Sequence, residues 1–97
     1  MIYIKIHKGV GTFVTSVCDS ELVGKKFKKG KFVLEVSERF YKGELVDEDK
    51  VKDYLENSTN LNIVGERSVD IALKLGLISK EHILIIEGVP HAQSVIL

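Results

Sequence analysis

The spacing of hydrophobic and polar residues predicts a chain that begins with β-strands. Residues 2–7 alternate isoleucine with tyrosine, lysine and histidine, which is the period-two pattern of a half-buried strand. Glycines on both sides of residue 10 predict a turn, and residues 12–17 are rich in β-branched side chains, so the two segments should pair as a hairpin. The apolar segment at 32–36 predicts a third strand, and a single helical turn is expected at 21–23.

Two helices are expected in the middle of the chain. Asp47 has the position of an N-cap residue, and the helix after it should run to about Asn57 with Val51 buried against the sheet. A second helix is predicted over residues 61–75, where apolar side chains recur at helical spacing. Gly76 is placed to end that helix.

The last fifteen residues predict a second pair of strands. Two apolar runs, at 83–86 and 95–97, flank a short polar connection that holds Pro90. Because proline cannot donate a backbone hydrogen bond to a β-ladder, Pro90 is expected in the turn or on a sheet edge, with His91 and Gln93 facing solvent or a partner. Together the elements predict one α+β domain over the whole chain, a small and mostly antiparallel sheet with two helices packed on it.

The composition is that of a globular protein. Hydrophobic residues make up 44% of the 97 residues and charged residues 29%, which excludes a disordered chain. No apolar run approaches the roughly 18–20 residues of a membrane-spanning helix, and the N-terminus lacks the apolar core of a signal peptide. A single cysteine, Cys18, excludes an intrachain disulfide and a cysteine-rich zinc site. We therefore expect a cytoplasmic protein with no membrane partner.

The charges are divided unevenly along the chain. Residues 1–42 carry nine Lys or Arg and four Asp or Glu, a net charge of +5, whereas residues 43–97 carry five and ten, a net charge of −5. One interpretation is that the two halves attract each other across the fold or solvate separate faces. The other is a basic face for an anionic partner, with an acidic face kept away from it.

A lysine-rich segment is the strongest compositional signal of function. Five lysines fall within seven residues around one aromatic residue, Phe27, and they are Lys25, Lys26, Lys28, Lys29 and Lys31. Such a segment forms a flexible cationic loop that can follow a phosphate backbone while the phenylalanine stacks or anchors. The alternative is a solvated loop with Phe27 turned into the core. It is not a Walker loop, because the required glycine spacing and the Lys-Ser/Thr ending are missing.

Cys18, Asp19 and His91 form an alternative, catalytic candidate. An imidazole can lower the pKa of a thiol while a carboxylate orients the imidazole. The competing interpretation makes Cys18 a buried strand residue and Asp19 a turn or helix cap. The histidines, His7, His82 and His91, have no zinc-like spacing, so neither a metal nor a cofactor is expected.

The start of the predicted second helix holds a further polar group. Asn62 and Glu66 are four residues apart and would point the same way on a helix, next to Arg67. A helix N-terminus at which Gly65 allows close approach can hold an anion or a nucleic-acid backbone. Gly65 equally permits tight packing of the helix on the sheet.

Several short motifs occur together, and they are Cys18-Asp19, residues 22–25, 36–37, 40–43 and 62–67, and the closing residues 88–93. Their combination resembles the small archaeal family catalogued as domain of unknown function 424, over nearly the whole chain. The resemblance implies an archaeal, cytoplasmic, single-domain α+β protein with no agreed activity. It supplies no catalytic residues.

The sequence therefore favours a binding module, an accessory RNA-binding or ribonucleoprotein-binding protein related to translation. The alternatives are a small enzyme centred on Cys18 and His91, and a protein–protein adaptor with two oppositely charged faces. The residues expected to contact the partner are the five lysines with Phe27, and then Asn62, Glu66, Arg67, His91 and Gln93.

Overall fold

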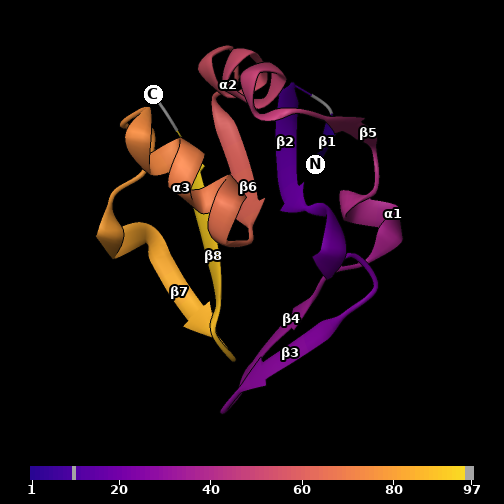
Figure 1. Ribbon diagram of the computed structural model, residues 1–97, viewed down its shortest axis with the longest axis vertical. Helices are drawn as coiled ribbons and strands as arrows, with labels where there is room; N and C mark the ends of the chain where they lie inside the picture. Colours follow the sequence, from indigo (N-terminus) through magenta and orange to yellow (C-terminus); the bar gives the residue numbers. More distant parts are fainter. Residues whose placement is uncertain (10, 96–97) are drawn as a thin grey trace.

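Eight strands form the framework of the described residues. A computed structural model describes residues 1–9 and 11–95, and its arrangement is shown in Figure 1. The strands are β1 (Ile2–Gly9), β2 (Thr12–Asp19), β3 (Lys26–Lys29), β4 (Phe32–Glu35), β5 (Glu44–Val46), β6 (Asn60–Val64), β7 (Ile83–Ile86) and β8 (Val89–Val95). Six of them form one sheet in the order β5-β1-β2-β6-β8-β7, and β3 pairs with β4 in a separate hairpin.

Short helical segments connect these strands. The α-helices are α1 (Glu38–Tyr41), α2 (Glu48–Glu56) and α3 (Glu66–Lys74), and the 3-10 turns are η1 (Ser20–Leu22) and η2 (Lys80–His82). None of the helices in the described ranges is long and apolar enough to cross a membrane.

The main sheet is mostly antiparallel, as the sequence predicts. β1 and β2 pair along their whole length, and the predicted turn residue between them, Val10, lies outside the described residues. β2 runs parallel to β6, whereas the other described pairings are antiparallel. Val95 pairs with Asn60, and the predicted pairing of residues 96 and 97 also lies outside the described residues. The predicted α+β class, with two helices packed on this sheet, is confirmed.

Asp47 begins α2, as predicted. Its carboxylate accepts a hydrogen bond from the backbone N–H of Lys50 at 3.0 Å, which satisfies one of the unpaired donors of the first helical turn. Val51 and Leu55 lie on the buried side of the helix, and α2 ends at Glu56.

The predicted helix over 61–75 is wrong in its first part. Asn60–Val64 instead forms β6 at the centre of the sheet, and α3 starts only at Glu66. Leucine, isoleucine and valine in this segment fit both a helical stripe and a buried strand, so spacing alone did not separate the two. Gly65 marks the break, because its φ of 110° is incompatible with a helix. The predicted end of the helix at Gly76 is confirmed by a φ of 73°.

Apolar cores lie on both faces of the six-stranded sheet. α2 and α3 cover one face, over a core that includes Ile4, Val17, Leu55, Ile63 and Ala72. The β3–β4 hairpin, α1 and η1 cover part of the other face, over Cys18, Leu34, Val36, Tyr41, Val64 and Ile86. The second core is smaller, and it leaves part of its sheet face to polar side chains.

The C-terminal strands pair as predicted, with a difference at Pro90. β7 and β8 are joined by Glu87 and Gly88, which have φ values of 50° and 79°. Pro90 is neither in this turn nor at an edge, because it is buried in β8, between β6 and β7. It is tolerated there because the β6 ladder ends opposite His91, and the carbonyl of Pro90 accepts a hydrogen bond from the N–H of Gly65 at 2.9 Å.

Candidate functional site

Asp19, the last residue of β2, caps the N-terminus of α3. Its carboxylate accepts hydrogen bonds from the backbone N–H groups of Arg67 and Ser68, at 3.0 and 2.9 Å, and from the Ser68 hydroxyl at 2.7 Å. Gly65 occupies the N-cap position of this helix and has no side chain to do so. The prediction that Asp19 is a cap is therefore confirmed, although for α3 and not for the adjacent η1, where it makes no side-chain cap.

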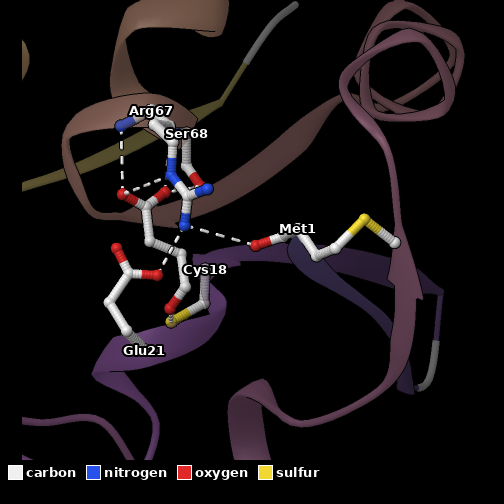
Figure 2. Close-up of polar contacts among 6 residues, drawn as sticks. Met1, Cys18, Glu21, Arg67 and Ser68 are labelled. Carbon is white, nitrogen blue, oxygen red and sulfur yellow. Dashed lines mark hydrogen bonds and ion pairs between the residues drawn. The ribbon is translucent and has the colours of Figure 1, made fainter.

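Arg67 extends this cluster to the surface. Its guanidinium lies 2.5 Å from the carboxylate of Glu21 and 3.7 Å from that of Asp19, and it donates to the carbonyl of Met1 at 3.4 Å, as Figure 2 shows for the labelled residues. A cleft of about 340 Å³ lies alongside and is also lined by Glu66. Two of the N–H groups that would hold an anion at this helix terminus, those of Arg67 and Ser68, are already bonded to Asp19.

Asn62 and Glu66 do not share a helix face, contrary to the prediction. Asn62 belongs to β6 and Glu66 is the first residue of α3, with the turn at Gly65 between them.

Gly65 lies directly against Asp19, because a Cβ atom on Gly65 would lie 2.3 Å from Cγ of Asp19. The glycine is therefore required by the packing of the Asp19 carboxylate against α3.

Cys18 does not have the environment of a thiol nucleophile. Its side chain is fully buried, and the thiol donates to the carbonyl of Asp19 at 3.3 Å. Burial, reinforced by the negative charges of Asp19 and Glu21, raises the pKa of Cys18 to about 12. Cys18 lies opposite Val64, which lies opposite His91, so a whole strand separates the thiol from the imidazole. The thiol therefore stays protonated and out of reach of the predicted base.

His91 is a hydrogen-bonding residue of the sheet. Its Nδ1–H donates to the carbonyl of Ile63 at 3.0 Å, and the ring is half-buried. Burial lowers the pKa of His91, and the bond to Ile63 opposes this shift. The prediction that His91 faces solvent or a partner is therefore wrong, because the fold holds its imidazole against the Ile63 carbonyl.

The remaining histidines also have local partners. His7 stacks on Phe40 with ring centroids 4.2 Å apart, and its Nε2–H donates to the Phe40 carbonyl at 2.8 Å. Nδ1 of His82 accepts a hydrogen bond from the N–H of Ser79 at 2.9 Å. Across residues 1–9 and 11–95, no three His, Cys, Asp or Glu side chains gather closely enough to hold a metal ion.

The lysine-rich segment forms a β-hairpin and not the predicted flexible loop. β3 and β4 project from the end of the molecule that lies opposite α2 (Figure 1). The backbone N–H of Lys28 donates to the Glu87 carboxylate at 2.8 Å, which ties β3 to the β7–β8 turn. All five lysines are exposed, and within the described part of the chain none of them forms an ion pair.

Two phenylalanines lie on one face of this hairpin. Phe27 is opposite Leu34 and packs on the second core, so it anchors the hairpin. Phe32 is opposite Lys29, further along the same face, and 59% of its surface is exposed. Sequence reasoning missed Phe32, because alternation shows which residues share a strand face but not how far the body of the protein covers that face.

The sheet brings Asn62 and Gln93 together. They are direct cross-strand partners on β6 and β8, on the face that carries the hairpin. The hydroxyl of Tyr41 donates to Oδ1 of Asn62 at 2.7 Å. Burial raises the pKa of Tyr41 to about 12, so the phenol remains a donor at neutral pH. Asn62 and Gln93 thus form a group separate from Glu66 and Arg67, which lie in the cleft beside Asp19.

The fold and these side chains define a small α+β protein in which the five lysines, Glu66 and Gln93 are exposed, whereas Cys18 and Asp19 are buried. The chain belongs to the family described as Protein of unknown function (DUF424), whose model matches residues 7–97. The family resemblance expected from the motifs is therefore confirmed. The structure is similar to the crystal structure of an uncharacterized conserved protein from Methanopyrus kandleri, with a TM-score of 0.81 and 30% identity over 99% of this chain and 91% of that chain. A comparison with curated proteins finds no match.

Proposed function

We propose that this protein binds single-stranded RNA through the β3–β4 hairpin, as an accessory component of a ribonucleoprotein in an archaeal cytoplasm. The observation that carries the proposal is the group of five exposed lysines on and beside a projecting hairpin, none of which forms an ion pair within the described residues. Lysines grouped in this way neutralise phosphates of a bound strand and release the counterions condensed on it.

The two faces of the hairpin support contacts to both phosphates and bases. Because alternate strand residues share a face, Lys26 and Lys28 lie on the outer face, away from the core. Lys29 and Phe32 lie opposite each other on the inner face, beyond the part that Phe27 anchors. An exposed aromatic ring among lysines is the combination with which proteins bind single strands without sequence preference.

The distribution of charge over the molecule also supports the proposal. The acidic residues of α2 and its N-cap are exposed, and they are Asp47, Glu48, Asp49, Asp53 and Glu56. Figure 1 places α2 and the hairpin at opposite ends of the molecule. In the electric field of a polyanion this separation of charge turns the hairpin towards the polyanion and α2 away from it. Of the two interpretations of the charge asymmetry, it favours a basic end for an anionic partner.

The test compares two double variants that remove the same charge. Binding of a fluorescent twelve-nucleotide RNA is measured by anisotropy over a range of salt concentrations. Lys28→Gln/Lys29→Gln should flatten the slope of log Kd against log salt by about 1.4, because each phosphate contact of a single strand contributes about 0.7. Lys50→Gln/Lys52→Gln, on α2, should leave the slope unchanged. Equal effects from both variants, or no binding at low salt, would refute the proposal.

A further inference from the structure

An open groove lies on the sheet face that the hairpin and α1 leave uncovered. Its volume is about 350 Å³, and it is defined by Val14, Phe40, Asn60, Leu61, Asn62, Gln93, Ser94 and Val95. We call it the amide groove. None of these lining residues is charged, so the groove suits a neutral polar group and not a phosphate.

Three amide side chains lie on the floor of the amide groove. Asn62 is opposite Gln93, and Asn60 lies two residues before Asn62 on the same strand face. Because Oδ1 of Asn62 accepts the Tyr41 hydroxyl, its NH2 group remains as a donor. The side chains of Asn60 and Gln93 form no hydrogen bond to another described residue, so each offers a donor and an acceptor.

Phe40 is the rigid wall of the amide groove. His7 stacks on its ring with an interplanar angle of 12°, and the Tyr41 ring meets it edge-on with centroids 4.8 Å apart. The carbonyl of Phe40 accepts from the buried Ser16 hydroxyl at 3.0 Å and from Nε2–H of His7 at 2.8 Å. These contacts hold the aromatic residue in place before any ligand arrives, which lowers the entropy cost of binding.

The amide groove is continuous with the lysine hairpin. A second hollow, of about 420 Å³, shares Phe40 and Asn62 with the groove and is also lined by Glu35. Glu35 is the cross-strand partner of Lys26 in the hairpin. The second hollow therefore connects the amide groove to the end of the β3–β4 hairpin at which Lys26 and Glu35 pair.

We infer that the amide groove binds an unstacked adenine base of the strand whose phosphates the hairpin contacts. The inference rests on the proposed RNA binding and adds base recognition to it. A primary amide presents a donor and an acceptor in one plane, which matches N6 and N7 of adenine, and Gln93 is free to make this pair. Single-stranded RNA is recognised in this way, by splayed bases that pack on aromatic residues and hydrogen-bond through their edges.

The test uses oligonucleotides of twelve adenosines or twelve uridines with the full-length protein. Gln93→Ala should weaken binding of the adenosine oligomer about tenfold, because a bidentate amide contact discriminates bases to this extent. The uridine oligomer should lose less affinity, and the salt slope should stay unchanged. Thr59→Ala, an exposed substitution beside a different hollow on the other side of the sheet, is the matched control and should alter neither affinity.

A second measurement follows the side-chain NH2 resonances of Asn60, Asn62 and Gln93 by NMR while the adenosine oligomer is added. Selective shifts of these signals would support the groove as the base site. RNA could bind with the expected salt slope while Gln93→Ala binds as tightly as the unmodified protein and the NH2 signals do not shift. In that case the base-recognition inference is wrong, but the proposal of RNA binding by the hairpin is not contradicted. If the protein binds neither oligomer at low salt, both proposals fail.

Discussion

Asp19 occupies the space that a side chain at position 65 would need. A Cβ atom on Gly65 would lie 2.3 Å from Cγ of Asp19 and 2.5 Å from its Oδ2, which is the oxygen that accepts the N–H of Arg67. The carboxylate can cap α3 from the end of β2 only because residue 65 has no side chain. This relationship joins the central sheet to the helix that follows β6.

Replacement of Gly65 by alanine should therefore cost more than backbone strain alone. Gly24→Ala is the matched control, since Gly24 has a φ of 91° and open space around its Cβ position. We expect Gly24→Ala to lower the free energy of unfolding by about 1–2 kcal/mol. Gly65→Ala should lower it by about 3–5 kcal/mol, because a steric clash is added to the strain. Urea unfolding measures both, and equal losses would contradict the role given to Asp19.

The same relationship explains why the start of α3 was misplaced by sequence reasoning. An N-cap residue is normally sought next to the helix, but here the capping carboxylate comes from a strand distant in sequence. The apolar side chains of residues 61–64 fit helical spacing, so the sequence pattern places them in the helix. Only the pairing of β6 with β2 and β8 shows that they are central strand residues, and this long-range pairing is not encoded in local periodicity.

Cys18 should react slowly with thiol reagents in the native protein. Its pKa is raised from 9.0 to about 12, so the native thiol forms about a thousandfold less thiolate than an unperturbed cysteine.

The raised pKa of Cys18 also makes the free energy of unfolding depend on pH, because the thiol of the unfolded chain loses its proton first as the pH rises. The contribution of Cys18 to the free energy of unfolding should be complete below pH 9.0 and decline between pH 9.0 and about 12.

The measurement is the rate of labelling near neutral pH, with and without denaturant. Fast labelling of the native protein that is abolished by His91→Ala would restore the catalytic interpretation of Cys18. Labelling that appears only with unfolding would agree with its buried position.

His91 should make the protein less stable in mild acid. Burial lowers its native pKa below 6.5, so the unfolded chain binds a proton first as the pH falls. The free energy of unfolding should therefore decrease from pH 6.5 down to the native pKa, and be independent of this group above pH 6.5. His91→Gln removes the titration, and the variant should show a shallower decrease in the same range. Identical pH profiles for the two proteins would show that His91 titrates normally in the fold.

Composition predicts which residues bind a partner better than the sequence predicts where those residues lie in the fold. The lysine segment is visible in the sequence because five like charges lie close together, and all five are exposed. Its form as a hairpin was not visible, because lysines are depleted in strands and the pairing depends on Phe27 and Leu34 packing on the second core. The contact between Asn62 and Gln93 depends on strand register, which only the folded sheet defines.

Phe32 and Phe13 provide a matched pair for testing whether the lysine hairpin is a specific RNA-binding element. Their exposed fractions are 59% and 58%, and each lies opposite a lysine, Lys29 and Lys8 respectively. Phe32 lies in the hairpin that carries the lysine-rich segment, whereas Phe13 lies in the β1–β2 hairpin. Stacking of one base on an aromatic side chain contributes about 1–3 kcal/mol, so Phe32→Ala should weaken RNA binding at least about fivefold. Phe13→Ala should leave the affinity unchanged.

Neither substitution should change the melting temperature appreciably, because both rings are mostly exposed. Anisotropy with the twelve-nucleotide RNA measures the affinities, and thermal unfolding monitored by circular dichroism checks the fold. Equal losses of affinity from the two variants would mean that any exposed phenylalanine beside a lysine contributes to RNA binding as much as Phe32 does. RNA would then be bound by the surface in general, and the assignment of binding to the β3–β4 hairpin would have to be abandoned.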